Sequence, residues 1–241
     1  MNTLITFDLD NTLWDVEPVI VRADYAMESW FDDRFPGFTQ QFNMAKMQAI
    51  KAELMAQDDQ LKVDISRVRV EMYRRALLQF GLPAEEANKV AISAFAHFHE
   101  WRQKVDHYPH TLDMLKQLGK SYRLAVITNG NADVYHPYIG LGHVFEFAIR
   151  ADQEGVAKPD ASLFIKAAQA IDVPLSSVVH IGDHPYDDVF GEVYVSLVSV
   201  GEKTGKLEEI LADLADMLKW EDELASKAKK VMIYPAIVAT V

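Results

Sequence analysis

Residues 3–13 read TLITFDLDNTL, and their pattern dictates the kind of sheet that this chain forms. The first five residues, 3–7, are mostly apolar and rich in β-branched and aromatic side chains, whereas residues 8–12 are mainly polar. A short apolar run that turns abruptly polar predicts a buried β-strand with a loop at its carboxyl end. We therefore expect a strand in the core that presents Asp8 and Asp10 where it ends.

The same pattern recurs in the second half of the chain, where short apolar runs alternate with segments of helical periodicity. Strands are expected at 124–127, 145–149 and 178–181, and helices at 112–118 and 161–171. Strands that alternate with helices predict an α/β fold with a doubly wound, Rossmann-like parallel sheet. Ligands of such sheets lie at the carboxyl ends of the strands.

Residues 16–105 differ from the rest of the chain. They contain few glycines and are rich in Ala, Met, Gln, Lys and Glu, with apolar residues at helical spacing. Gly81 and Pro83 interrupt this stretch and separate two helical segments. The pattern predicts a helical module inserted between the first strand and the remainder of the sheet.

Composition narrows the class of protein. The 241 residues are 49% hydrophobic and 25% charged, which is typical of a globular chain that buries a sizeable core. With no cysteine there can be no disulfide and no thiolate site, and the amino terminus does not resemble a signal peptide, so we expect a cytoplasmic protein. The formal net charge of −12 disfavours nucleic acid as a partner.

The polar residues at the predicted strand ends are of the types that a metal-dependent catalytic site requires. Asp8 and Asp10 follow the first strand, Thr128 and Asn129 the second and Asp183 the last. Clustered carboxylates repel one another, and a hard divalent cation such as Mg²⁺ relieves this repulsion. Asp8 is then a candidate nucleophile towards phosphorus, and Asp10 a candidate general acid and base.

The other side chains complete that hypothesis. Lys158, the hydroxyl of Thr128 and the backbone amide of Asn129 would hold the phosphoryl oxygens and offset developing charge. Each motif alone is commonly an ordinary turn, and only their order, strand context and spacing together favour a catalytic site.

Four segments resemble, in order, the motifs of the haloacid dehalogenase-like hydrolases: FDLDNTL at 7–13, AVITNG at 125–130, KP at 158–159 and HIGDHPYDD at 180–188. The resemblance covers residues 1 to about 191. It implies a core formed by 1–15 and 106–191, with 16–105 as an α-helical cap that closes over the substrate.

The resemblance also implies a ligand set and a reaction. Mg²⁺ would be bound by Asp8, the backbone carbonyl of Asp10 and Asp183, with Asp188 and Thr12 supporting the ion from behind its ligands. An aspartate at the position of Asp10 is typical of the phosphatases and mutases of this family.

Within the family, the chain is most similar to bacterial phosphatases that act on FMN and on the phosphorylated ribitylaminouracil of riboflavin synthesis. We therefore expect hydrolysis of a small phosphorylated metabolite through an aspartyl-phosphate. Two alternatives stay open: a phosphomutase on the same scaffold, and a non-catalytic interaction module that uses the end of the chain.

Residues 192–241 do not follow the pattern of the core. An apolar run comes too soon after Asp188 for a crossover helix, and an amphipathic segment then begins at Leu207. VGEKTGKL at 200–207 and MIYPAI at 232–237 resemble the F-type inner-membrane platform proteins of type II secretion and type IV pilus systems. We expect a fusion junction near Gly191, and membrane contact only through this tail; alternatively, the tail completes the sheet.

Overall fold

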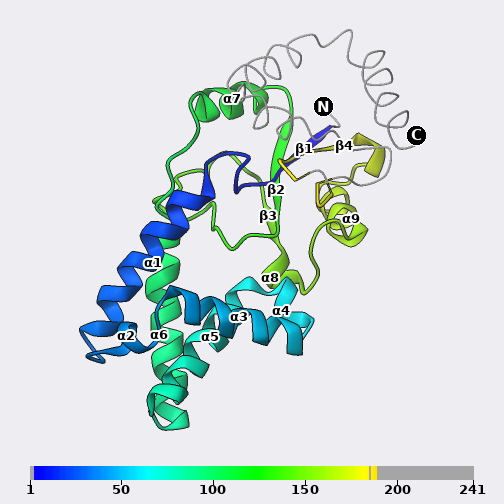
Figure 1. Ribbon diagram of the computed structural model, residues 1–241. Helices are drawn as coiled ribbons and strands as arrows, with labels where there is room; N and C mark the ends of the chain where they lie inside the picture. Colours follow the sequence, from blue (N-terminus) through cyan, green and yellow to red (C-terminus); the bar gives the residue numbers. More distant parts are fainter. Residues whose placement is uncertain (1–2, 185, 189–241) are drawn as a thin grey trace, which may run out of the picture.

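A computed structural model describes residues 3–184 and 186–188, so the expectations for the segment 192–241 lie outside the described residues. Its centre is a four-stranded sheet in the order β3-β2-β1-β4, and every pairing is parallel (Figure 1). The strands are β1 (Leu4–Phe7), β2 (Arg123–Thr128), β3 (Ala148–Arg150) and β4 (Val178–Ile181). The parallel α/β sheet that the alternating pattern predicts is confirmed.

Helices cover both faces of the sheet, because successive side chains of a strand point to opposite sides. Ile5 and Phe7 of β1 pack with helix α7 (Thr111–Leu118), whereas Leu4 packs with helix α9 (Ala161–Ala170). A short helix, α8 (Ala151–Glu154), and a 3-10 turn (Leu175–Ser177) complete this part of the chain. The doubly wound arrangement follows from this alternation.

Six helices lie between β1 and α7 and form a body beside the sheet (Figure 1). They are α1 (Val16–Asp32), α2 (Phe38–Gln41), α3 (Met44–Gln57), α4 (Gln60–Val63), α5 (Ile65–Phe80) and α6 (Ala84–Arg102). Buried residues of α1 recur every four positions from Val19 to Phe31, which places them on one face. Ala23, Met27 and Phe31 of that face join a hydrophobic core separate from the core of the sheet, which Val19 joins. We call these six helices the helical insertion.

Local sequence sets where these helices begin and end. The Asp15 carboxylate accepts a hydrogen bond from the backbone N–H of Glu17 and caps α1. Helix α5 ends at Gly81, whose φ of 112° is in the left-handed region that glycine adopts without strain. The start of α1 and the end of α5 are therefore each set by a single residue at that position.

The structure departs from the expected elements mainly at β3. The pattern predicts a strand over residues 145–149, but the regular strand comprises residues 148–150. Glu146 and Phe147 already exchange backbone hydrogen bonds with β2, and the Phe145 side chain packs in the core. The apolar pattern therefore marks burial correctly, and the regular strand begins a few residues later. Among the described residues, no helix is long and apolar enough to cross a membrane.

Candidate active site

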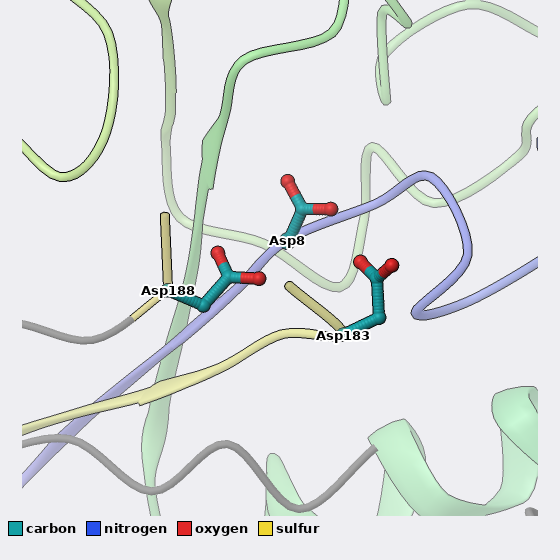
Figure 2. A group of neighbouring side chains, drawn as sticks. All are labelled: Asp8, Asp183 and Asp188. Carbon is teal, nitrogen blue, oxygen red and sulfur yellow. The ribbon is translucent and has the colours of Figure 1, made fainter. Parts of the chain in front are cut away.

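The sheet register brings the ends of β1, β2 and β4 together. Phe7, the last residue of β1, pairs with Val126 on one side and with Ile181 on the other. The next residue, Asp8, extends this pairing, because its backbone N–H donates to the Ile181 carbonyl at 2.8 Å. Three carboxylates gather here: those of Asp8, Asp183 and Asp188 each offer one oxygen within 4.8 Å of the others (Figure 2).

Lys158 provides the buried cation of this cluster. Its Nζ donates to Asp8 Oδ1 at 2.8 Å and to Asp188 Oδ1 at 2.5 Å. Burial alone would lower the pKa of the Lys158 ammonium, but the two carboxylates outweigh burial and raise it. One fixed positive charge is therefore shared between two carboxylates in an interior where an unpaired charge is very costly.

The pKa values of the Asp8 and Asp188 carboxyls are shifted in opposite directions. Burial raises the pKa of Asp8 to about 7, with the Lys158 ammonium opposing the rise and Asp188 adding to it. Burial also acts to raise the pKa of Asp188, but the His180 hydrogen bond and the Lys158 charge outweigh it and hold that pKa well below its usual range. Asp188 therefore carries a negative charge, whereas the protonation state of Asp8 depends on what binds beside it.

His180 fixes Asp188 from inside the core. Its Nε2 lies 3.0 Å from Asp188 Oδ1, and its Nδ1 lies 2.9 Å from Thr6 Oγ1. Burial lowers the pKa of His180 to about 4 and the Lys158 ammonium adds to this effect, so the ring is neutral. The Thr6 hydroxyl also donates to the Val179 carbonyl at 3.3 Å, and which ring nitrogen of His180 carries the hydrogen depends on the tautomer. These bonds connect β1, β4 and the segment that carries Asp188.

Asn129 has a role that the sequence did not indicate. Its Oδ1 accepts from the Lys158 backbone N–H at 2.7 Å, and its Nδ2 donates to the Lys158 carbonyl at 3.2 Å. The side chain therefore positions the backbone of Lys158. The Thr128 hydroxyl lies close by and accepts from the Gly130 N–H at 3.0 Å.

Asp10 faces the helical insertion. Its Oδ1 accepts from Trp14 Nε1 at 2.9 Å, and both of its carboxylate oxygens accept from Arg102 Nη2 at 2.7 and 2.5 Å. A Cβ on Gly130 would meet Asp10 Oδ2 at 2.5 Å, so this glycine leaves the space that the carboxylate occupies. The Asp10 carboxylate is thereby held between the core and the last residue of α6.

Three further hydrogen bonds join the helical insertion to the core. Arg102 Nε donates to Asn131 Oδ1 at 3.1 Å, and Asn131 Nδ2 donates to Ser66 Oγ on α5 at 3.2 Å. The Ser66 hydroxyl in turn donates to Asp152 Oδ2 at 2.7 Å. Loop residues of the core thus bind two different helices of the insertion.

A cavity of about 230 Å³ opens between the insertion and the core beside Asp10. Its polar lining consists of Asp10, Lys51, Arg69, Arg102 and Asn131. The remaining lining is apolar and comes mainly from α1, α5 and α6. We call this space the insertion cavity.

The structure brings every residue of the predicted site to one region, although their roles remain proposals. Asp8, Asp183 and Asp188 converge directly, Thr12 Oγ1 donates to Asp183 Oδ1 at 3.3 Å, and Lys158 binds two of the three carboxylates. The oxygen donors of this cluster suit Mg²⁺, which prefers hard anionic ligands.

Sequence reasoning missed Arg102 and His180. Both are buried polar residues, at exposed fractions of 1% and 0%. His180 lies in the apolar run 178–181, where a polar residue is a signal that could have marked it. Arg102 lies among other polar residues, so its sequence context carries no such signal.

Comparison with known proteins identifies the family. The family described as haloacid dehalogenase-like hydrolase matches residues 3–191. A 2-haloacid dehalogenase from Pseudomonas syringae pv. Tomato DC3000 superposes with a TM-score of 0.73 at 32% identity, covering 89% of this chain and 100% of that one. The 5-amino-6-(5-phospho-D-ribitylamino)uracil phosphatase YigB of Escherichia coli (strain K12) is 35% identical over 189 residues, which are 78% of each chain.

A different kind of relative also matches. The type II secretion system protein F of Vibrio cholerae serotype O1 is 32% identical over 116 residues, 48% of this chain but only 27% of that protein. The family match over residues 3–191 nevertheless spans most of the chain. The chain therefore belongs to the haloacid dehalogenase-like hydrolases.

Proposed function

We propose that this haloacid dehalogenase-like hydrolase is a Mg²⁺-dependent phosphomonoester hydrolase that acts through an aspartyl-phosphate on Asp8. The observation that carries the proposal is the sharing of the buried Lys158 ammonium between Asp8 and Asp188 beside a third carboxylate, that of Asp183. A cation and several carboxylates fixed on one spot suit a group that brings its own negative charge and a metal ion, as a phosphate ester does.

The chain's own residues account for two chemical steps. An Asp8 carboxylate oxygen attacks phosphorus, the bond from phosphorus to the ester oxygen breaks, and Asp10 gives its proton to the departing alcohol. A water molecule then attacks phosphorus, Asp10 takes a proton from it, and inorganic phosphate leaves with Asp8 restored. Lys158, the Thr128 hydroxyl and the Asn129 backbone amide hold the phosphoryl oxygens.

Asp8, Asp183 and the backbone carbonyl of Asp10 would bind Mg²⁺, with Asp188 and Thr12 behind them. When bound, the ion supplies positive charge that offsets the carboxylates and the phosphoryl group. The division of labour between residues 1–15 and 106–191 as the core and 16–105 as the cap belongs to the same proposal.

For the substrate, we propose a small phosphorylated metabolite of the riboflavin pathway, hydrolysed in the cytoplasm. The relative YigB, whose printed name gives the phosphate of ribitylaminouracil, supports this class. The insertion cavity of about 230 Å³ is smaller than the roughly 300–1,000 Å³ of pockets for drug-sized ligands. It therefore favours this single-ring compound over FMN, whose flavin has three fused rings.

The test is phosphate release from a panel of phosphomonoesters, with Mg²⁺ and with EDTA. The wild-type chain should release phosphate only with the metal, and Asp8→Asn should abolish release because an amide is a poor nucleophile. Asp113→Asn, an exposed position on α7, is the matched control and should retain full activity. Turnover by a folded Asp8→Asn chain would refute the proposal, and a requirement for a bisphosphate would identify a mutase instead.

A further inference from the structure

We propose that Arg102 recognises the leaving group of the substrate. Its Nη1 donates a hydrogen bond to an oxygen on the carbon next to the ester carbon. The preferred substrates are therefore phosphates of polyols and other vicinally hydroxylated chains. This inference rests on the proposed phosphatase function and deepens it.

The first observation concerns the guanidinium of Arg102, which is 1% exposed. Its Nη2 donates to Asp10 and its Nε to Asn131. Its Nη1 is buried and has no acceptor among the residues that the structure describes. A buried donor of a charged group that lacks a partner is costly, and native proteins rarely keep one without a purpose.

The second observation is where this guanidinium lies. Arg102 lines the insertion cavity together with Asp10 and Asn131. Most of the other wall residues are apolar: Val16, Ile20, Ile65, Val68, Met72 and Phe98. They offer no side-chain hydrogen-bonding partner for Nη1, so its acceptor has to come from what enters the cavity.

The other two cations of the cavity, Arg69 and Lys51, interact with groups other than Asp10. Arg69 donates to Asp24 at 2.7 Å and to Tyr73 at 3.4 Å, and its guanidinium lies over the Phe98 ring at 3.5 Å. Lys51 lines the cavity, but none of its contacts reaches Asp10. Arg102 is therefore the cation best placed to sense the part of the substrate nearest the reacting bond.

The position of the required acceptor follows from the fork shape of arginine. Nη1 and Nη2 are bonded to the same carbon, and Nη2 holds the carboxylate that protonates the ester oxygen. An atom bound to Nη1 consequently lies close to that ester oxygen. A hydroxyl on the neighbouring carbon meets this condition, whereas a hydroxyl farther along an alkyl chain does not.

The experiment compares two isomeric substrates, the 1-phosphates of propane-1,2-diol and of propane-1,3-diol, with Mg²⁺ present. They differ only in where the free hydroxyl stands. A hydrogen bond from a charged donor should raise kcat/KM for the 1,2-isomer about 10- to 100-fold over the 1,3-isomer in the wild-type chain.

Arg102→Lys keeps a positive charge near Asp10 but cannot span the carboxylate and the hydroxyl together. Both rates should fall, and the ratio between the isomers should approach one. Arg67→Lys, at an exposed position on α5, is the matched control and should keep the wild-type ratio. If Arg102→Lys does not fold, the wild-type ratio decides alone.

Three results would overturn the inference. One is a wild-type ratio within about twofold of unity, since a hydrogen bond from a charged donor should exceed it. Another is an equal loss for both isomers in Arg102→Lys, which would mean that Arg102 acts through Asp10 or on the phosphoryl group. The third is the absence of Mg²⁺-dependent turnover of any phosphomonoester, which would refute the proposed function and this inference with it.

Discussion

Replacing Gly130 with alanine tests whether the position of Asp10 controls the rate. The new Cβ would lie 2.5 Å from Asp10 Oδ2, whereas ordinary contacts begin at 3.4 Å, so the carboxylate has to move by about 0.9 Å. It cannot move freely, because Trp14 and Arg102 both hold it. A displacement of about 1 Å in a reacting group costs on the order of 100-fold in rate.

The Gly130→Ala variant should stay folded, because the expected net loss of stability is at most about 2.6 kcal/mol. Overpacking costs about 1–3 kcal/mol, and the smaller conformational freedom of the unfolded alanine chain offsets about 0.4–1 kcal/mol of it. Gly130 is not among the positive-φ glycines, so alanine can adopt its backbone conformation.

The assays are urea unfolding and kcat for phosphate release from an alkyl phosphate, whose alcohol leaving group needs a proton to depart. Gly119→Ala is the matched control, because its Cβ would meet the Leu115 carbonyl oxygen at 3.3 Å, away from the site residues. The control should keep its kcat. If Gly130→Ala also keeps its kcat within a few fold, the position of Asp10 does not limit the reaction and its assignment as the acid is wrong.

Two further predictions concern the charges around Asp8. Replacing Lys158 with Met leaves Asp8 and Asp188 without their shared cation, so urea unfolding should show a loss of about 3–5 kcal/mol; a loss below about 1 kcal/mol would contradict this account. Because burial raises the pKa of Asp8 to about 7, the metal-free chain should lose stability as the pH rises through that value. Mg²⁺ would replace the proton, so it should raise the Tm more at about pH 8 than at about pH 6, and equal shifts would argue against a metal site at Asp8.

Much of the fold could be predicted because its signals are local. The apolar run before Asp8 predicts a strand, and the structure has one at residues 4–7. The run before Gly182 does the same for β4, at the predicted residues 178–181. Parallel pairing then places both loops at one edge, which is why Asp8 and Asp183 could be expected to meet.

The partners of the site residues could not be predicted in this way. Lys158 was assigned to the phosphoryl group, and nothing in a Lys-Pro pair shows that its ammonium joins Asp8 to Asp188. Arg102 lies 92 positions from Asp10, at the end of a helix whose pattern indicates only packing. Contacts of this kind depend on how the helical insertion packs against the core, and the hydrophobic periodicity of a sequence does not indicate this packing.

The site consequently has two halves with different structural supports. Asp8, Lys158 and Asp188 are held by strands of the sheet and by the buried His180. Asp10 is held from the opposite side by Arg102, the last residue of α6, and α6 packs on α1 and α5 within the helical insertion. A shift of the insertion would leave the Lys158 contacts of Asp8 in place but would withdraw the donor that orients the Asp10 carboxylate. The proposed aspartyl-phosphate site therefore depends on the core, whereas the alignment of the proposed acid, Asp10, depends on α6, which also lines the insertion cavity.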